Sequence, residues 1–144
     1  MRDTLSVVGF ALMVGGLVGL FYAGSLFLPV PAVIAVQALA AVLMLWARIT
    51  FGKRSFHASA TPTAGGLVNT GPYRYLRHPI YTAVMLFVWP GAIARHLPAA
   101  IGFAALMSLG AIVRMLCEEY LLVRQYPEYV EYARTTKRMI PFVL

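Results

Sequence analysis

Residues 5–28 read LSVVGFALMVGGLVGLFYAGSLFL, a stretch without a single charged side chain. Crossing the ~30 Å apolar core of a bilayer takes about 20 helical residues, so this stretch is long enough to span a membrane. It also exceeds the roughly 7 to 15 apolar residues of a cleaved secretory signal, and we expect it to remain as a spanning helix. Gly15 and Gly19 have the GxxxG spacing that lets helices approach closely, either inside this chain or at a homodimer seam.

Three further apolar runs follow, over roughly residues 32–50, 79–94 and 98–117, and Pro90-Gly91 is expected to interrupt the second of them. The 144-residue chain is 60% hydrophobic and only 12% charged, with a mean hydropathy of +0.76. Soluble domains are about half apolar and a quarter charged. We therefore predict an all-α integral membrane protein, a single domain over residues 1–144 with about four transmembrane helices.

The basic residues predict the orientation, because Lys and Arg accumulate on the cytoplasmic side of membranes. They cluster in the loop between the second and third runs and in the tail: Lys53, Arg54, Arg74, Arg77, Arg124, Arg134, Lys137 and Arg138. With four spans, both termini would be cytoplasmic. The net charge of +7 follows from this topology, and the soluble basic face of a nucleic-acid-binding protein is missing from the pattern.

Cysteine and histidine spacing argues against a metal site. Cys117 is the only cysteine, so neither an intrachain disulfide nor a cysteine-rich metal site can form. His57, His78 and His96 fall in different loops and lack the HExxH spacing of zinc enzymes. We expect no bound metal.

The longest polar segment, GKRSFHASATPTAGGLVNTG (52–71), leads into GPYRYLRHPIY (71–81). An aromatic belt in front of a spanning helix would account for the tyrosines and arginines. It would not account for a histidine placed directly before Pro79. Because a residue before proline avoids the α-helical region, we expect His78 to sit at a rigid bend that aims its ring and that of Tyr81 at one point.

Arg114 and Glu118 are four positions apart and share a helix face near the cytoplasmic boundary. Ionisable groups at that depth are costly and often functional. An ion pair that merely anchors the helix is the alternative, and the sequence leaves both open. In the tail, Pro127-Glu128 marks a new helix start, and a stripe of tyrosines would dock on the membrane or cover a site: Tyr126, Tyr129 and Tyr132.

Three segments together resemble the isoprenylcysteine carboxyl methyltransferase family, which includes relatives acting on phospholipid amines. They are LVNTGPYRYLRHPIYT (67–82), Arg114 with Glu118-Glu119, and PEYVEYARTTKRMIP (127–141). The first two helices match only in character, and the chain is shorter than the characterised members. The family's Phe-Gly before the tail tyrosines is replaced here by Tyr126-Pro127.

The resemblance implies methyl transfer from S-adenosyl-L-methionine, held by the cytoplasmic loop and the helical tail, to a lipophilic or lipidated acceptor. The positions that match the family's cofactor pocket are Gly65, Gly66, Leu67, Val68, Tyr73, His78, Pro79, Ile80, Tyr81 and Glu118. Arg114 matches the residue that meets the acceptor and is the catalytic candidate. In keeping with this, the sequence lacks the GxGxxG fingerprint of nucleotide-binding folds.

The residue types suit this chemistry, because tyrosine rings, an imidazole and a carboxylate are sensible partners for a sulfonium cation. A carboxylate acceptor, as in isoprenylcysteine, is our first expectation; it is already nucleophilic and needs alignment by Arg114 rather than a base. A phospholipid amine would have to lose a proton, and Glu119 or His78 would be candidate bases. The sequence does not decide between these acceptors.

Three rival functions fit less well. Membrane sterol reductases, which use NADPH, share an Arg-His-Pro-x-Tyr stretch, but there x is typically Asn and an acidic residue follows, in place of Ile80 and Thr82-Ala83 here. A small multidrug exporter needs a carboxylate in its first helix, and residues 5–28 contain none. A purely structural membrane subunit would leave the order of residues 71–81 without a purpose.

Overall fold

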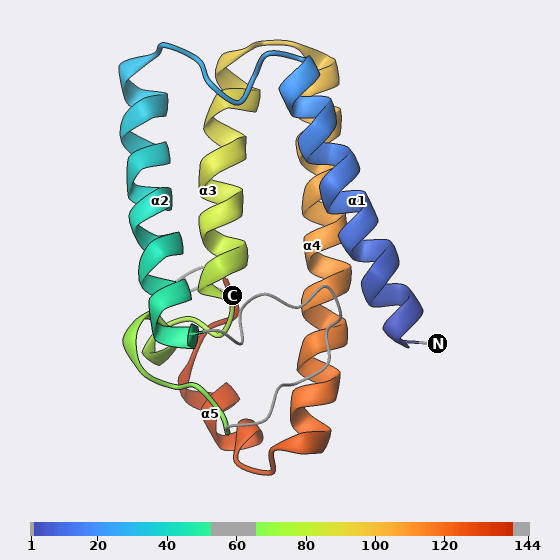
Figure 1. Cartoon of the computed structure of the whole chain (residues 1–144), viewed down its shortest axis with the longest axis vertical. Helices are drawn as coiled ribbons and strands as arrows, with labels where there is room; N and C mark the ends of the chain where they lie inside the picture. The colour runs from blue at the N-terminus through green and yellow to red at the C-terminus, as the bar shows by residue number, and fades with distance from the viewer. Residues whose placement is uncertain (1, 53–65, 140–144) are drawn as a thin grey trace.

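The computed structural model describes residues 2–52 and 66–139. In chain order their helices are α1 (Arg2–Tyr22), α2 (Pro31–Phe51), the 3-10 helix η2 (Gly71–Arg74), α3 (Pro79–Ala94), α4 (Pro98–Gln125) and α5 (Tyr129–Thr135). Figure 1 shows α1 to α4 side by side in an up-and-down bundle, with η2 and α5 gathered at one end. The predicted all-α membrane fold is confirmed.

Three of the helices, α1, α2 and α4, are long and apolar enough to cross a membrane. The fourth, α3, has 16 residues, which is about 24 Å of helix and shorter than the ~30 Å bilayer core. It packs along α2 and touches α4. The outward faces carry exposed apolar side chains such as Leu39, Val42 and Leu109, as expected where a helix faces lipid.

The first helix ends at Tyr22, earlier than the apolar pattern predicts. Gly24 adopts a left-handed φ of +64°, and the amides of Gly24 and Ser25 donate to the carbonyls of Phe21 and Leu20. This is the Schellman arrangement in which a glycine terminates a helix. Residues 23–28 therefore form a connection rather than the last turns of a span.

α1 packs along α4 through a seam of small residues. A Cβ added at Gly9 would lie 2.8 Å from the carbonyl oxygen of Gly110, and one added at Gly16 would lie 2.7 Å from the Cβ of Met107. Gly19 meets the Phe103 ring in the same way. The two backbones can approach closely only because these positions lack side chains.

The expected Gly15–Gly19 motif is thus half right. A Cβ at Gly15 would meet nothing within 4 Å, because that residue points away from α4, whereas Gly16 takes its place in the seam. The close helix approach occurs within one chain, as one of the two alternatives anticipated.

α3 runs without a break through Pro90 to Ala94, so the interruption expected at Pro90-Gly91 is wrong. Gly91 instead lets the carbonyl of Ser25 press against the helix, where any Cβ would clash with it. Nearby, the buried Gln37 side chain of α2 donates to the carbonyls of Leu26 (2.7 Å) and Phe87 (3.0 Å). These bonds tie α2, α3 and the α1–α2 connection together.

α4 continues to Gln125, beyond the end expected near residue 117. Hydropathy marks where a membrane ends, not where a helix ends, and only Tyr126-Pro127 interrupts the backbone pattern here. The extra two turns carry Glu118 and Glu119 past the apolar part of the bundle. At that end they meet the start of α3 and the tail.

Candidate active site

The segment 71–78 is held against the end of α2. Gly71 has φ +56°, and a Cβ there would lie 2.5 Å from Thr50 Oγ1, so both its conformation and its surroundings demand glycine. Tyr73 is buried, with its ring centroid 5.4 Å from that of Phe51. The short helix η2 therefore sits on α2 and delivers the following residues to the start of α3.

His78 occupies the bend that the sequence predicts. Its backbone lies outside the α region (φ −127°, ψ 56°), and Pro79 is the first residue of α3. The imidazole is buried: Nδ1 lies 3.8 Å from Glu118 Oε2, and Nε2 lies 3.3 Å from Glu119 Oε1. One ring thus stands between two neighbouring carboxylates of α4.

Tyr81, in the first turn of α3, joins the same cluster. Its ring centroid is 5.8 Å from that of His78. Its hydroxyl donates to Glu118 Oε1 at 2.7 Å and accepts from Arg114 Nε at 2.9 Å. Arg114 Nε is also 3.2 Å from Glu118 Oε1, so the i,i+4 pair expected on α4 is formed and is shared with a tyrosine.

Glu119 has a different set of partners. Besides His78, it lies 3.4 Å from Arg77 Nη1 and accepts from Arg138 Nε at 3.1 Å and 3.3 Å, one bond to each oxygen. Three basic side chains therefore surround one largely buried carboxylate. Because both of its oxygens are already engaged, Glu119 is poorly placed to take a proton from a substrate.

The tail is strapped to the segment 71–78 through backbone bonds. The amides of Arg77 and His78 donate to the carbonyls of Lys137 (2.7 Å) and Arg138 (3.0 Å), and the Lys137 amide donates back to Tyr75. Farther along, the Thr82 hydroxyl donates to the Met139 carbonyl at 2.7 Å. The strand-like tail therefore fixes both Arg138 and the bend at His78.

Two of the tail tyrosines, Tyr129 and Tyr132, pack inward beside this cluster. Tyr129 is almost fully buried, and the Tyr132 hydroxyl donates to the Tyr73 carbonyl at 2.6 Å. Burial raises the pKa of Tyr132 to about 12, so its hydroxyl stays protonated and able to donate. Of the two roles considered for the stripe, covering a site is the one that the contacts favour.

The predicted site residues fall into three groups. Glu118 contacts His78, Tyr81 and Arg114, and Tyr81 also bonds to Arg114. Pro79 and Tyr73 are buried beside them, and Ile80 is partly buried at the start of α3. Gly66, Leu67 and Val68 lie in the approach to η2, outside regular secondary structure, and Gly65 lies outside the described residues.

Three residues of the cluster escaped the sequence reasoning: Arg77, Thr82 and Arg138. Arg77 directly precedes His78, and this position beside the motif was the only sequence signal that Arg77 belongs to the site. Arg138 reaches Glu119 from a tail with no periodic pattern, so its partner cannot be read from spacing. Thr82 carried no signal beyond its place at the end of the motif.

The cluster combines a buried polar shell with one accessible acid. The side chains of His78, Arg114 and Glu119 are 5%, 8% and 11% exposed, whereas that of Glu118 is 23% exposed. A partly open carboxylate among buried rings is suited to bind a cation from outside. Within residues 2–52 and 66–139, no group of three or more His, Cys, Asp or Glu side chains is arranged to hold a metal ion.

Comparisons with known proteins give a family match and two similar curated proteins. Residues 30–129 match the family described as phospholipid methyltransferase. The nickel-cobalt-cadmium resistance protein NccN of Alcaligenes xylosoxydans xylosoxydans is 37% identical over 78 residues, which cover 52% of this chain and 36% of that protein. The cobalt-zinc-cadmium resistance protein CzcN of Cupriavidus metallidurans is 35% identical over 78 residues, covering 52% and 35%.

The matched segment spans about a third of the length of these curated relatives. No solved structure is significantly similar to this chain.

Proposed function

Because this chain belongs to the phospholipid methyltransferase family, we propose that it transfers a methyl group from S-adenosyl-L-methionine to a lipophilic acceptor in the membrane. The observation that carries the proposal is the accessible Glu118 carboxylate beside the rings of His78 and Tyr81, at the end of a membrane bundle. This is where a cationic donor from the aqueous phase and an acceptor from the bilayer can meet.

The residues present fit the donor. S-adenosyl-L-methionine supplies an electrophilic methyl group on a sulfonium cation. Glu118 offers the negative charge, and the rings of His78 and Tyr81 offer faces that attract a cation. Glu119 is paired with two arginines, Arg77 and Arg138. Glu118 is paired with one, Arg114, and is the more exposed of the two acids, so it is the carboxylate better placed to face the sulfonium.

Our first candidate acceptor is a lipophilic carboxylate such as that of an isoprenylcysteine. Arg114 is buried at the boundary of the bundle and is held by Tyr81 and Glu118, so it can orient an anionic group. With such an acceptor, the carboxylate oxygen would take the donor's methyl group as the carbon–sulfur bond breaks, giving a methyl ester and a neutral thioether. Because opposite charges cancel during this step, the burial around Arg114 favours it, and no base is needed.

A phospholipid amine is the second candidate, favoured by the family's description. It would need a proton acceptor. Glu119 is occupied by Arg77, His78 and Arg138, so of the two bases considered His78 is the better placed. The carboxylate acceptor avoids this requirement, which is why we rank it first.

The names of the two relatives refer to resistance to nickel, cobalt, zinc and cadmium. We propose that any such role of this chain would act through methylation of a membrane component rather than through a metal bound at His78. That imidazole already faces two carboxylates which themselves pair with arginines.

Binding and transfer can be tested on detergent-purified protein. We expect S-adenosylhomocysteine to bind by calorimetry and NADPH not to bind. With a methyl-labelled donor, a prenyl-cysteine analogue should be labelled faster than phosphatidylethanolamine in the same micelles. Binding of NADPH alone would overturn the proposal, whereas labelling of the amine lipid alone would keep the enzyme class and reverse the acceptor.

A further inference from the structure

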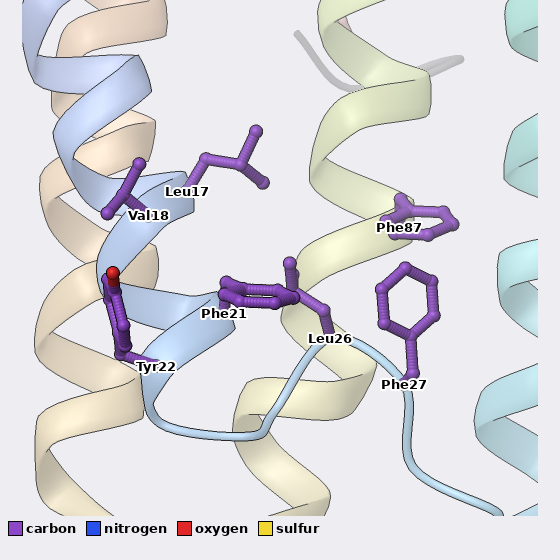
Figure 2. A pocket seen from close by; sticks show the side chains of 7 residues that line it. All are labelled: Leu17, Val18, Phe21, Tyr22, Leu26, Phe27 and Phe87. Carbon is purple, nitrogen blue, oxygen red and sulfur yellow. The ribbon is translucent and has the colours of Figure 1, made fainter.

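A second feature lies at the other end of the bundle from His78. An apolar groove of about 490 Å³ runs between α1 and α3, beside the α1–α2 connection. Figure 2 shows Leu17, Val18 and Phe21 of α1 on one side and Phe27 and Phe87 on the other. The volume is within the ~300 to 1,000 Å³ of ordinary small-molecule sites.

The groove is suited to a hydrocarbon chain. Its lining is almost entirely aliphatic and aromatic, and the Phe27 and Phe87 rings meet edge to face with centroids 6.2 Å apart. A narrow flexible hydrocarbon chain can lie along a groove of this kind.

A cation stands at the mouth of the groove. Arg95 follows the last residue of α3, is exposed, and donates from Nε to the Ala23 carbonyl at 3.2 Å. Ala23 directly follows Tyr22, which lines the groove. The guanidinium is therefore fixed where the apolar helix ends and a lipid headgroup would lie, and guanidinium is the side-chain group best matched to phosphate.

Among the side chains described, residues 4–52 and 66–139, no carboxylate forms an ion pair with Arg95. The five acidic residues of the sequence stand at the start of α1 or from the end of α4 onward: Asp3, Glu118, Glu119, Glu128 and Glu131. All of those positions belong to the opposite end of the bundle (Figure 1). Within the described part of the chain no acidic side chain pairs with this positive charge, so an external anion is a suitable partner for it.

We propose that this groove binds one anionic phospholipid, with an acyl chain between α1 and α3 and the phosphate on Arg95. The site is separate from the His78 cluster and does not depend on the proposed methyl transfer. An anionic headgroup should bind about five-fold more tightly than a zwitterionic one with the same chains, the gain expected from a single basic side chain at a membrane surface.

Native mass spectrometry of delipidated protein, titrated with dioleoyl phosphatidylglycerol or dioleoyl phosphatidylcholine, tests the site. Val18→Trp and Leu17→Trp each fill the groove from an exposed position of α1, and both should weaken binding of both lipids at least ten-fold. Arg95→Gln should abolish only the preference for phosphatidylglycerol. Val42→Trp on the outer face of α2 and Arg134→Gln in α5 are matched controls that should change neither value.

Two results would overturn the proposal. If lipid affinity is unchanged in both tryptophan variants, with helical content intact by circular dichroism, the lipid binds elsewhere. If Leu17→Cys instead cross-links two copies of the chain in native membranes, a second copy covers the groove. Testing two tryptophan positions keeps the result decisive if one variant does not fold.

Discussion

Two single variants, Glu118→Gln and Glu119→Gln, distinguish an effect on ligand binding from an effect on stability at two adjacent positions. In Glu118→Gln, the remaining amide oxygen can still accept from Tyr81 and Arg114, which both use Oε1. The new amide group faces His78 at 3.8 Å, beyond hydrogen-bond distance. The shape of the site is kept and its negative charge is lost.

Loss of the Glu118 charge should lower the affinity for a ligand that carries the sulfonium charge and leave the affinity for a ligand without it unchanged. Opposite charges ~4 to 6 Å apart attract by about 3 to 4 kcal/mol at an effective dielectric constant of ~20. Exposure of Glu118 and its pairing with Arg114 reduce this figure, and we expect about 1.4 kcal/mol, a ten-fold change in affinity. S-adenosylmethionine carries the sulfonium charge and S-adenosylhomocysteine lacks it, so the ratio of their dissociation constants should rise about ten-fold.

Glu119→Gln should give the opposite pattern. Both Glu119 oxygens accept charge-assisted bonds, and the new amide group would point donor to donor at Arg77 or Arg138. Losing bonds of ~1.5 to 3 kcal/mol each and leaving the largely buried Arg77 without its carboxylate partner should cost about 3 kcal/mol, a decrease in Tm of roughly 10 °C. The ratio of the two affinities should be unchanged.

Calorimetry with both ligands and thermal unfolding in one detergent measure the two effects. The reasoning fails if Glu118→Gln weakens both ligands equally, because Glu118 would then act through structure and not through charge. It also fails if Glu119→Gln changes the ratio while the Tm stays constant.

Three further predictions rest on single contacts. His78→Ala should lower the affinity for S-adenosylmethionine at least ten-fold by calorimetry, with helical content unchanged, because the imidazole that faces the methyl donor is lost. Unchanged affinity would mean that His78 does not line the pocket. Arg114→Lys should lower kcat for an anionic acceptor about 100-fold while ligand affinity stays within about three-fold, because lysine cannot reproduce the guanidinium geometry; equal losses in both would end this division of roles. Gly91→Ala should lower the Tm by roughly 10 °C, since its Cβ would meet the Ser25 carbonyl; an unchanged Tm would mean that the connection moves aside freely.

Much of the fold could be predicted from hydropathy, because a bilayer imposes long apolar helices on any chain that crosses it. Two of the errors came at helix ends. Gly24 terminates α1 inside an apolar run, where a glycine signal is easily lost among lipid-facing residues. α4 continues beyond the apolar run, because Glu118 and its neighbours leave the membrane without leaving the helix.

The candidate site could be predicted only in part. The proline bend at His78 and the i,i+4 pair of Arg114 and Glu118 are local and therefore visible in the sequence. The strap is different: residues 137–139 pair with 75–78 and Thr82 through backbone groups, which any residue provides. Long-range backbone pairing without periodicity leaves no trace in composition or spacing.

The two carboxylates owe their different roles to the pitch of one helix. Successive residues of an α-helix point about 100° apart, so Glu119 turns to the strap and Arg138 while Glu118 turns to Arg114. His78 stands between them, with one ring nitrogen toward each. Any displacement of the strap must therefore move the imidazole, and with it the surroundings of Glu118. The tail is thus part of the site, although among the side chains of the strap, residues 137–139, only that of Arg138 reaches a carboxylate of the site, Glu119.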